Sequence, residues 1–200
     1  MGTKSRIMET TFKLVLKKGF TDVSLNEIIK ASNTTTGGFY HHFNSKDALL
    51  LEVIEKYIFN YFNTTIEQIR SFEGTPKEKL QTMMLSIVAE CVNINEVSPK
   101  KVYYRNLHLL LMEGVQKYDV IGESYKKFYH NLLNFTKEVI DEGVDQGMIR
   151  QDIDSHELAI FTQTSILGTI IMWVGMPEMP LEERMISNID HLWNYMKIVE

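Results

Sequence analysis

The sequence predicts an all-α protein of about nine helices, and three observations support this class. Apolar residues recur at spacings of three and four along nearly every segment, which is the periodicity of helices with one buried face. We find no convincing run of alternating polar and apolar residues of the kind that marks a half-buried strand. Capping residues, glycines and prolines divide the chain into segments of helical length.

The first two helices have clear ends. The first is expected from about Lys4 to Lys18, with Gly19 ending it, because glycine readily takes the left-handed conformation that follows many helices. The second begins at Ser24, since Ser24 and Glu27 form a capping box in which each side chain satisfies a backbone N–H of the other residue. It is expected to end near Ala31.

The later helices follow from the same signals. A short helix is expected over about residues 36–43 and a long apolar one over about residues 46–63. Capping residues and prolines then predict five more helices. One starts at Thr75, one at Ser98 and one at Pro180, and the other two cover about residues 120–145 and 155–174.

Composition indicates a soluble globular protein with an uneven charge. The 200 residues are 44% hydrophobic and 24% charged, which are ordinary values. Residues 1–50 contain seven Lys/Arg and four Asp/Glu, a net charge of +3, whereas the other 150 residues carry 14 basic and 22 acidic side chains, a net charge of -8. The N-terminal quarter is therefore suited to a polyanionic partner, the alternative being an ordinary solvated basic face.

Neither a membrane span nor a secretion signal is predicted. The longest apolar stretch, Ile166–Met176, is about half a bilayer span and is interrupted by Gly168 and Thr169, so we expect a buried helix and no membrane partner. The N-terminal segment has no uninterrupted apolar core of signal-peptide length. Cys91 is the only cysteine, which excludes an intrachain disulfide and suits a reducing compartment. We therefore expect a cytoplasmic protein.

Residues 1–48 are expected to form a helix-turn-helix DNA-binding domain. A helix, a capped helix, a tight turn and a short helix occur in the order of that motif, whose last helix lies in the major groove. Thr35 would cap the short helix. Thr36 and Gly37 would then meet base edges, because threonine offers a hydroxyl and a methyl group and glycine allows close approach.

The aromatic cluster after these glycines divides between the core and the surface. Phe39 and Phe43 are four residues apart and should fill the core of the small domain, which leaves the other side chains of the cluster on other faces. Each of these side chains has the alternative of simple packing. The candidate DNA contacts are Ser24, Tyr40, His42 and Lys46 for phosphates and His41 for a base.

Residues 7–50 resemble the N-terminal domain of the tetracycline-repressor (TetR) family of bacterial transcription regulators. The segment Gly37–Leu49 is similar to the family signature G-x-[LIF]-Y-x-H-F-x-[ST]-K-x-x-L, and "KKGFTDVSLNEI" and "EGVDQGMIRQDID" are similar to other family segments. The resemblance implies that Tyr40, His42 and Lys46 contact phosphates. It also implies that Thr36, Gly37 and His41 lie over bases.

Residues 49–200 are expected to form a dimerisation and effector-binding domain. The helix over 155–174 becomes apolar on all sides toward its end, so it needs cover from more than one direction. A partner subunit in a two-fold bundle would supply that cover, and a thick monomer core is the alternative. The residues predicted for the homodimer interface are Ile166, Ile170, Trp173, Met185, Ile189 and Trp193.

The resemblance also implies a small-molecule pocket whose occupancy changes the separation of the two recognition helices. Half-sites on one face of DNA lie about 34 Å apart, so a small change in spacing prevents simultaneous docking. Apolar and aromatic candidates suit a lipophilic effector, although aromatic residues at helical spacing are more often plain core. The pocket candidates are Tyr103, Leu107, His108, Leu111, Tyr125, Tyr129, Phe161 and Trp173.

Two other classes compete with this prediction. An enzyme is disfavoured because the sequence contains no HExxH, Glu-x-x-His, P-loop or GxGxxG motif, and we expect no cofactor and no metal ion. A helical adaptor that binds protein through residues 1–50 is the other alternative. We expect a ligand-responsive repressor that binds a palindromic operator, as double-stranded DNA, in the form of a homodimer and is released by its effector.

Overall fold

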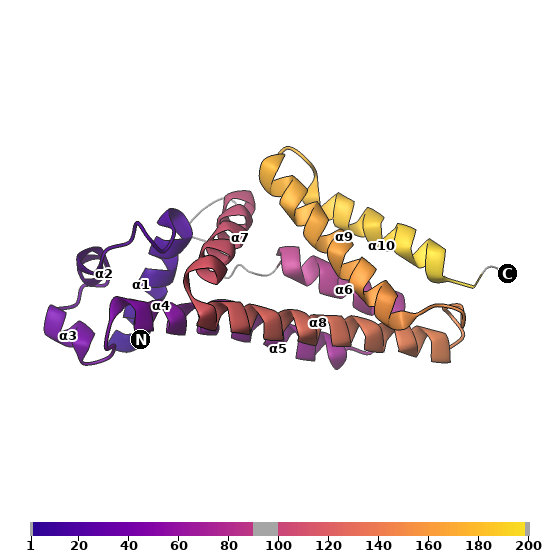
Figure 1. Cartoon of the computed structure of the whole chain (residues 1–200), viewed down its shortest axis with the longest axis horizontal. Helices are drawn as coiled ribbons and strands as arrows, with labels where there is room; N and C mark the ends of the chain where they lie inside the picture. Colours follow the sequence, from indigo (N-terminus) through magenta and orange to yellow (C-terminus); the bar gives the residue numbers. More distant parts are fainter. Residues whose placement is uncertain (1, 90–99, 199–200) are drawn as a thin grey trace. The chain divides into compact units, whose positions relative to one another are not determined.

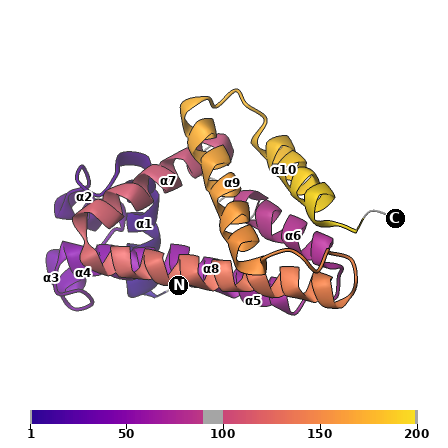
Figure 2. The same ribbon diagram turned by 45° about the vertical axis from the view of Figure 1, so that its right-hand side comes forward.

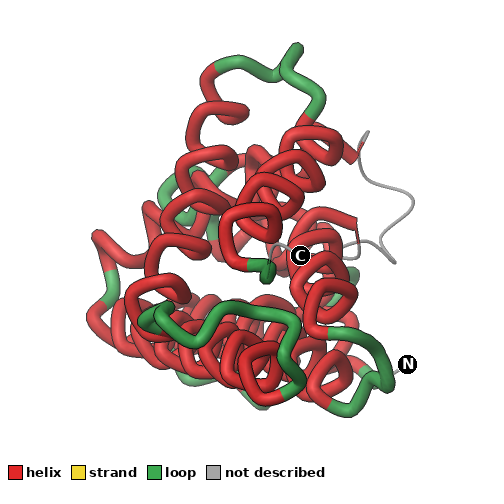
Figure 3. Tube along the Cα trace, turned by 90° about the vertical axis from the view of Figure 1, so that its right-hand side faces the viewer, coloured by secondary structure: helices red, strands yellow, loops and turns green. Residues whose placement is uncertain are grey.

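The computed structural model describes residues 2–89 and 100–198. These residues are helix or loop throughout, without a strand, and a single isolated β-bridge joins Ile149 to Lys197 in this part of the chain (Figure 3). The predicted all-α class is confirmed. The elements are α1 (Thr3–Lys18), α2 (Leu25–Ala31), α3 (Thr36–Tyr40), α4 (Lys46–Ile54), the π-helical segment η1 (Glu55–Phe59), α5 (Asn60–Arg70), α6 (Pro76–Ala89), α7 (Lys100–Lys117), α8 (Asp119–Asp145), α9 (Ser155–Gly175) and α10 (Leu181–Met196) (Figure 1).

The described residues form two compact units. Unit 1 comprises the described parts of Met1–Phe62 and Ile94–Lys127, and unit 2 those of Asn63–Asn93 and Phe128–Glu200. Helices α5 and α8 each begin in unit 1 and end in unit 2. Unit 1 groups α4 and α7 with the three N-terminal helices, so a functional boundary after residue 48 stays a prediction.

In unit 1, α1 packs against α2, α4 and α7 (Figure 2). The side chains of Phe12, Phe20 and Phe39 are almost completely buried. Aromatic side chains contribute large apolar areas to a core. The position of α3 is therefore determined by Phe39 from within, which leaves the opposite side of this short helix to solvent.

In unit 2, α10 packs against α6 and α9, and α9 and α10 run in opposite directions (Figures 1 and 2). The core includes Trp173 of α9 and Met185 and Ile189 of α10, each at most 1% exposed. The chain end is held by backbone hydrogen bonds from Arg150 N to Met196 O (3.0 Å) and from Ile198 N to Met148 O (3.2 Å).

Local capping agrees with the sequence prediction at several helix ends. Thr75 N donates to Glu78 Oε2 at 2.8 Å and Glu78 N donates to Thr75 Oγ1 at 3.3 Å, which is a complete capping box. Oδ1 of Asp154 accepts from the backbone N–H groups of His156 and Glu157 and caps α9. Gly147 has a φ of 68° after α8, as expected of a glycine that ends a helix.

Two helices differ in length from the prediction. The helix expected to stop near residue 63 continues through η1 and α5 to Arg70, because Phe62, Ile66 and Ile69 extend its buried stripe. Since α4, η1 and α5 are unbroken, the described chain has nine continuous helical segments. Helix α3 ends at Tyr40, although the bond from Phe43 N to Phe39 O (3.0 Å) adds another helical turn of hydrogen bonding.

Helix α9 has the length and apolar composition of a membrane span, with a mean hydropathy of 1.6 over an 18-residue window. The core helix of a soluble protein has the same properties, and Ile166, Ile170 and Trp173 on α9 are at most 3% exposed. We therefore describe α9 as a core helix of unit 2.

Candidate nucleic-acid interface

Helix α3 presents a row of small and polar side chains to solvent. Thr36, Gly37, Tyr40 and His41 are all exposed, and their spacing places them on one side of the helix. Thr35 Oγ1 accepts a 3.0 Å hydrogen bond from Gly38 N and caps the helix as predicted. The exposed row is therefore a surface that the fold itself does not use.

The turn between α2 and α3 is built on Asn33. Its φ is 47°, in the left-handed region that asparagine tolerates better than most residues. Thr34 N donates to Ile29 O at 3.1 Å and Asn33 N donates to Lys30 O at 3.2 Å, which is the hydrogen-bond pattern of a Schellman motif. This motif ends α2 and turns the chain sharply into α3.

The aromatic cluster divides as predicted. Phe39 and Phe43 are buried, at 0% and 3% exposure, whereas Tyr40 is 52% exposed. His41 is exposed and His42 is half-buried, and their rings meet edge to face at 4.9 Å. The two phenylalanines thus hold α3 to the domain, and the side chains of Tyr40 and His41 point away from the core.

Ser24 and Lys46 have structural roles as well as predicted phosphate contacts. Ser24 Oγ accepts from Glu27 N at 3.2 Å and caps α2. Lys46 Nζ donates to Val23 O at 2.6 Å and to Phe20 O at 3.4 Å. An ammonium group has three donors, so Lys46 can bind this loop and retain one N–H for a phosphate.

Sequence reasoning missed two lysines. Lys17 and Lys30 are exposed, and neither has an acidic partner among the described residues. Lys30 lies in the last turn of α2, just before the turn into α3. Both lysines are visible in the sequence at helix ends, but the sequence does not show whether a lysine forms an ion pair in the fold. In contrast, Lys4, Lys13 and Lys18 form ion pairs with Glu52, Glu9 and Glu27.

The family model described as "Bacterial regulatory proteins, tetR family" matches residues 7–53, which contain α2, α3 and most of α1 and α4. Over these residues the chain matches the TetR family of regulators. It is 31% identical over 78 residues to the HTH-type transcriptional repressor NemR of Escherichia coli (strain K12), a match that covers 39% of each chain. The chain thus matches about two fifths of the length of this relative.

Longer but weaker similarities extend over most of the chain. The HTH-type transcriptional regulator AcrR of Shigella flexneri is 21% identical over 176 residues, which are 88% of this chain and 80% of AcrR. A TetR transcription regulator from Haloarcula marismortui ATCC 43049 superposes with a TM-score of 0.79 at 16% identity, over 98% of each chain. At this identity the structural likeness shows the fold.

The predicted effector residues are distributed over both units. Leu107 and Leu111 are buried in unit 1, and burial lowers the pKa of His108 to about 4. Trp173 is buried in unit 2, Tyr125 and Tyr129 are half-buried, and the side chain of Tyr103 lies outside the described residues. Phe161 is 59% exposed, so it is a surface residue of unit 2.

The dimer residues named from the sequence need correction. Five of the six, namely Ile166, Ile170, Trp173, Met185 and Ile189, are at most 3% exposed within the chain itself, and Trp193 is half-buried. A side chain buried in this way cannot contact a partner. Because α9 is apolar around most of its circumference, the sequence did not show which side packs inward. The apolar side chains exposed on the same two helices are Phe161, Ile171, Met172, Ile186 and Tyr195.

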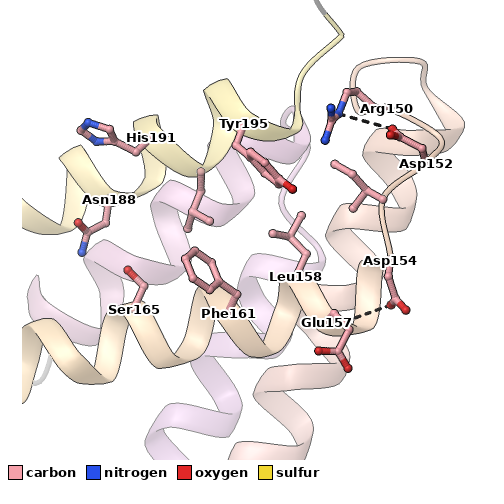
Figure 4. Close-up of a pocket in the computed structure, with 12 residues that line it drawn as sticks. Arg150, Asp152, Asp154, Glu157, Leu158, Phe161, Ser165, Asn188, His191 and Tyr195 are labelled. Atoms are coloured by element: carbon pink, nitrogen blue, oxygen red, sulfur yellow. Dashed lines mark hydrogen bonds and ion pairs between the residues drawn. The ribbon is translucent and has the colours of Figure 1, made fainter.

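Unit 2 also has a groove of about 790 Å³ between α9, α10 and the segment that precedes α9 (Figure 4). Phe161 and Leu158 of α9 face Tyr195 of α10 across it, and Arg150 lies above the Tyr195 ring at 5.1 Å from the ring centroid. The groove therefore opens onto the same exposed apolar surface of α9 and α10.

The core of unit 2 contains polar atoms whose hydrogen bonding is incomplete. Gln163 Nε2 donates to Thr136 Oγ1 at 2.7 Å, but Gln163 Oε1 is buried without a hydrogen-bond partner in the described chain. Trp173 Nε1 is likewise buried without a hydrogen-bond partner in the described chain. A buried polar atom without a partner costs about 1–3 kcal/mol, so each of these atoms is available to a ligand.

Proposed function

We propose that this TetR-family protein is a ligand-responsive transcription regulator that acts in the cytoplasm as a homodimeric repressor on a palindromic operator. The family consists of DNA-binding regulators rather than enzymes, and no catalytic role is assigned to any residue. A bound dimer obstructs polymerase by occupancy alone, which favours repression. The printed name of the relative NemR, a transcriptional repressor, agrees with this choice.

The observation that carries the proposal is the exposed row of α3. Thr36, Gly37, Tyr40 and His41 lie on the side of the helix that the domain core leaves free. A Cβ added to Gly37 would have no neighbour within 4 Å, so the fold does not require a glycine there. Glycine costs about 1 kcal/mol against alanine in a helix, and close approach to DNA explains why that cost is accepted.

Around this row we place the phosphate contacts. Tyr40, His42 and Lys46 keep their predicted roles, Ser24 lies at the exposed N-terminus of α2, and Lys17 and Lys30 add unpaired positive charge. Lysine contacts to phosphates supply affinity without sequence specificity and make binding dependent on salt. The candidate base readers are Thr36, Gly37 and His41.

The dimer is proposed to form through the exposed side of α9 and α10. Phe161, Ile171 and Met172 of α9 are each more than half exposed, and Gly168 between them has open space around it. A helix with large apolar side chains on either side of a glycine allows another helix to approach closely. The groove beside Phe161 and Tyr195 then belongs to the dimer face rather than to the effector site.

For the effector we propose a lipophilic molecule with a hydrogen-bond donor. His108 is neutral at pH 7 because its pKa lies near 4, and Leu107 and Leu111 on the same helix are apolar. A neutral imidazole offers one ring nitrogen as an acceptor, which suits a ligand with a hydrogen-bond donor. These side chains favour a ligand that is mainly apolar with a few polar groups.

The test is a titration of a fluorescent duplex from the upstream region of the gene at two salt concentrations. The protein should bind more weakly by a factor of about 10³ or more between 50 and 200 mM salt, the size expected for several phosphate contacts. Tyr40→Phe and Lys46→Ala should each weaken binding without unfolding the protein, and Gly37→Leu should block docking.

The matched control is Lys126→Ala, which removes an exposed lysine of α8 outside the TetR domain. This variant should bind the duplex as the wild type does. Binding that is absent, or indifferent to salt, would contradict the proposed function and favour the helical adaptor. Loss of binding in all four variants alike would contradict the assignment of α3 as the reading element.

A further inference from the structure

The loop that joins α1 to α2 is bound by a carboxylate from α7. Glu113 Oε2 accepts from Phe20 N at 3.0 Å, and Glu113 Oε1 accepts from Thr21 N at 3.0 Å and from Thr21 Oγ1 at 2.8 Å. Hydrogen bonds to an ionised acceptor are stronger than neutral ones. Glu113 therefore acts on this loop as a capping group that comes from a distant helix.

The loop is shaped to receive this carboxylate. Gly19 has a φ of 81°, and a Cβ at this position would lie 2.6 Å from Glu113 Oε2. Desolvation alone would raise the pKa of Glu113, but the hydrogen bonds from Thr21 and Phe20 and the charge of Lys117 outweigh it and hold the pKa below its ordinary value. Glu113 is thus ionised at neutral pH.

Lys46 binds the same loop through its carbonyl groups. Its ammonium group donates to Val23 O at 2.6 Å and to Phe20 O at 3.4 Å, so Phe20 has its N–H bound by Glu113 and its C=O by Lys46. The residue after Val23 is Ser24, which caps α2. Two of the proposed phosphate contacts, Ser24 and Lys46, therefore adjoin the loop that Glu113 holds.

A second contact connects the same region to α4. Tyr118, directly after α7, donates through its hydroxyl to Asp47 Oδ1 at 2.9 Å, and its ring meets the Phe20 ring edge to face at 5.7 Å. A Cβ on Gly114 would lie 3.0 Å from Phe20 and from Ile121, so α7 packs closely against the loop. The end of α7 and the DNA-binding helices are held together by specific contacts.

We propose that Glu113 is a positioning residue for operator binding, which holds the α1–α2 loop and with it Ser24 and Lys46 in the geometry that binds DNA. This inference rests on the proposed function and specifies how its regulation reaches the DNA-binding helices. Leu107, His108 and Leu111, three of the predicted effector residues, lie on α7 within two turns of Glu113. A ligand that displaces α7 therefore displaces the carboxylate that holds the loop.

The hydrogen bonds of Glu113 are sensitive to a small movement. They measure 2.8–3.0 Å, and a movement of α7 away from the loop by about 1 Å would take them beyond the range of normal hydrogen bonds. The loop would then lose two backbone N–H partners and one hydroxyl partner together. Coupling of this kind between an effector site and a second site usually changes affinity by about 5- to 150-fold.

The experiment measures operator binding of the full-length protein with Glu113→Gln and Thr21→Val. Glu113→Gln keeps the shape of the side chain but removes its charge, which weakens its hold on the loop. The dissociation constant for the operator should then rise by about tenfold. The salt dependence of binding should fall by about the amount that one phosphate contact contributes, because Lys46 is no longer held in place. Hydrogen exchange at the amides of Phe20 and Thr21 should become faster. Thr21→Val should have a smaller effect in the same direction, and the two changes together should be less than additive.

Glu67→Gln is the matched control, because it breaks an ion pair between Glu67 and Arg70 on α5 in unit 2, whereas the loop belongs to unit 1. It should leave the operator affinity, its salt dependence and the hydrogen-exchange rates of the Phe20 and Thr21 amides unchanged. If Glu113→Gln does not fold, Thr21→Val decides the question. Wild-type affinity and salt dependence in the folded variants would overturn the proposal, as would weaker binding with unchanged salt dependence and amide exchange. Failure of the wild type to bind the duplex would instead refute the proposed function.

Discussion

Thr35 Oγ1 accepts a hydrogen bond from Gly38 N at 3.0 Å and lies 3.2 Å from the position that a Cβ on residue 38 would occupy. Thr34 Oγ1 is closer still, at 2.8 Å from the same position. The cap of α3 therefore requires a residue without a side chain at position 38. The neighbouring Gly37 has no such constraint, so the two adjacent glycines have different reasons to be present.

This difference predicts opposite effects of the same substitution at the two positions. Gly38→Ala should lower the free energy of unfolding by about 1–3 kcal/mol, because the methyl group displaces the hydroxyl groups of Thr34 and of Thr35, the residue that caps α3. Gly37→Ala should raise it by up to about 1 kcal/mol through helix propensity. Urea denaturation of the two variants measures both changes, and equal effects would show that crowding by Thr34 and Thr35 is unimportant.

The left-handed turn at Asn33 predicts a second pair of substitutions. Asn33→Gly should stabilise the protein by up to about 1 kcal/mol and Asn33→Val should destabilise it by about 1–2 kcal/mol, because a β-branched residue is strained at a φ of 47°. Thermal unfolding followed by circular dichroism measures both. Asn26→Val inside α2 is the control and should have little effect, since asparagine and valine have similar helix propensities. A neutral Asn33→Val would contradict the Schellman turn.

The desolvated imidazole of His108, which is half-buried, predicts a dependence of stability on pH. Its folded pKa of about 4 lies below the ordinary value of 6.5, so between these values the unfolded chain binds a proton that the folded chain does not. Stability should therefore fall as the pH is lowered from 6.5 toward 4, by on the order of 2–3 kcal/mol from this group.

His108→Gln removes this titration, so its unfolding free energy should depend less steeply on pH over the same interval. Urea midpoints at several pH values give the comparison. His156→Gln, at an exposed position in the first turn of α9, should keep the slope of the wild type. An unchanged slope in His108→Gln would mean that His108 is accessible to protons in the folded state.

The proposed dimer face predicts which apolar residues of α9 determine association. Phe161 and Ile171 are each 59% exposed, so Phe161→Glu and Ile171→Glu should leave the fold intact but place like charges together across a two-fold interface. Sedimentation velocity should then show a monomer, with weaker operator binding. Ile170→Glu, at a residue 3% exposed, should unfold the chain instead. A dimer that persists in both surface variants would place the interface elsewhere.

Several features of the DNA-binding domain could be predicted because their causes are local. Thr35 caps α3 and Ser24 caps α2 through N–H groups three residues ahead, and Gly19 after α1 has a positive φ of 81°, which glycine tolerates. The spacing of Phe39 and Phe43 similarly predicted their burial. Each of these inferences needs only the periodicity of a helix and the chemistry of its ends.

The orientation of α9 could not be predicted in the same way. Its apolar residues surround the helix, so the pattern shows that the helix is covered but does not show which side faces α10. Ile170 and Ile171 are adjacent in sequence and identical in chemistry, yet one is 3% and the other 59% exposed. Only packing against neighbouring helices distinguishes them.

The sequence by itself determined the all-α class, most of the helix starts and the helix-turn-helix, since these depend on residues within a few positions of one another. The tertiary structure alone decided which side of α9 is free and that Glu113 binds Phe20, a residue 93 positions away. The physical reason is that a carboxylate on a helix has no local signal for a distant backbone N–H. Its partner is set by how α7 packs against α1.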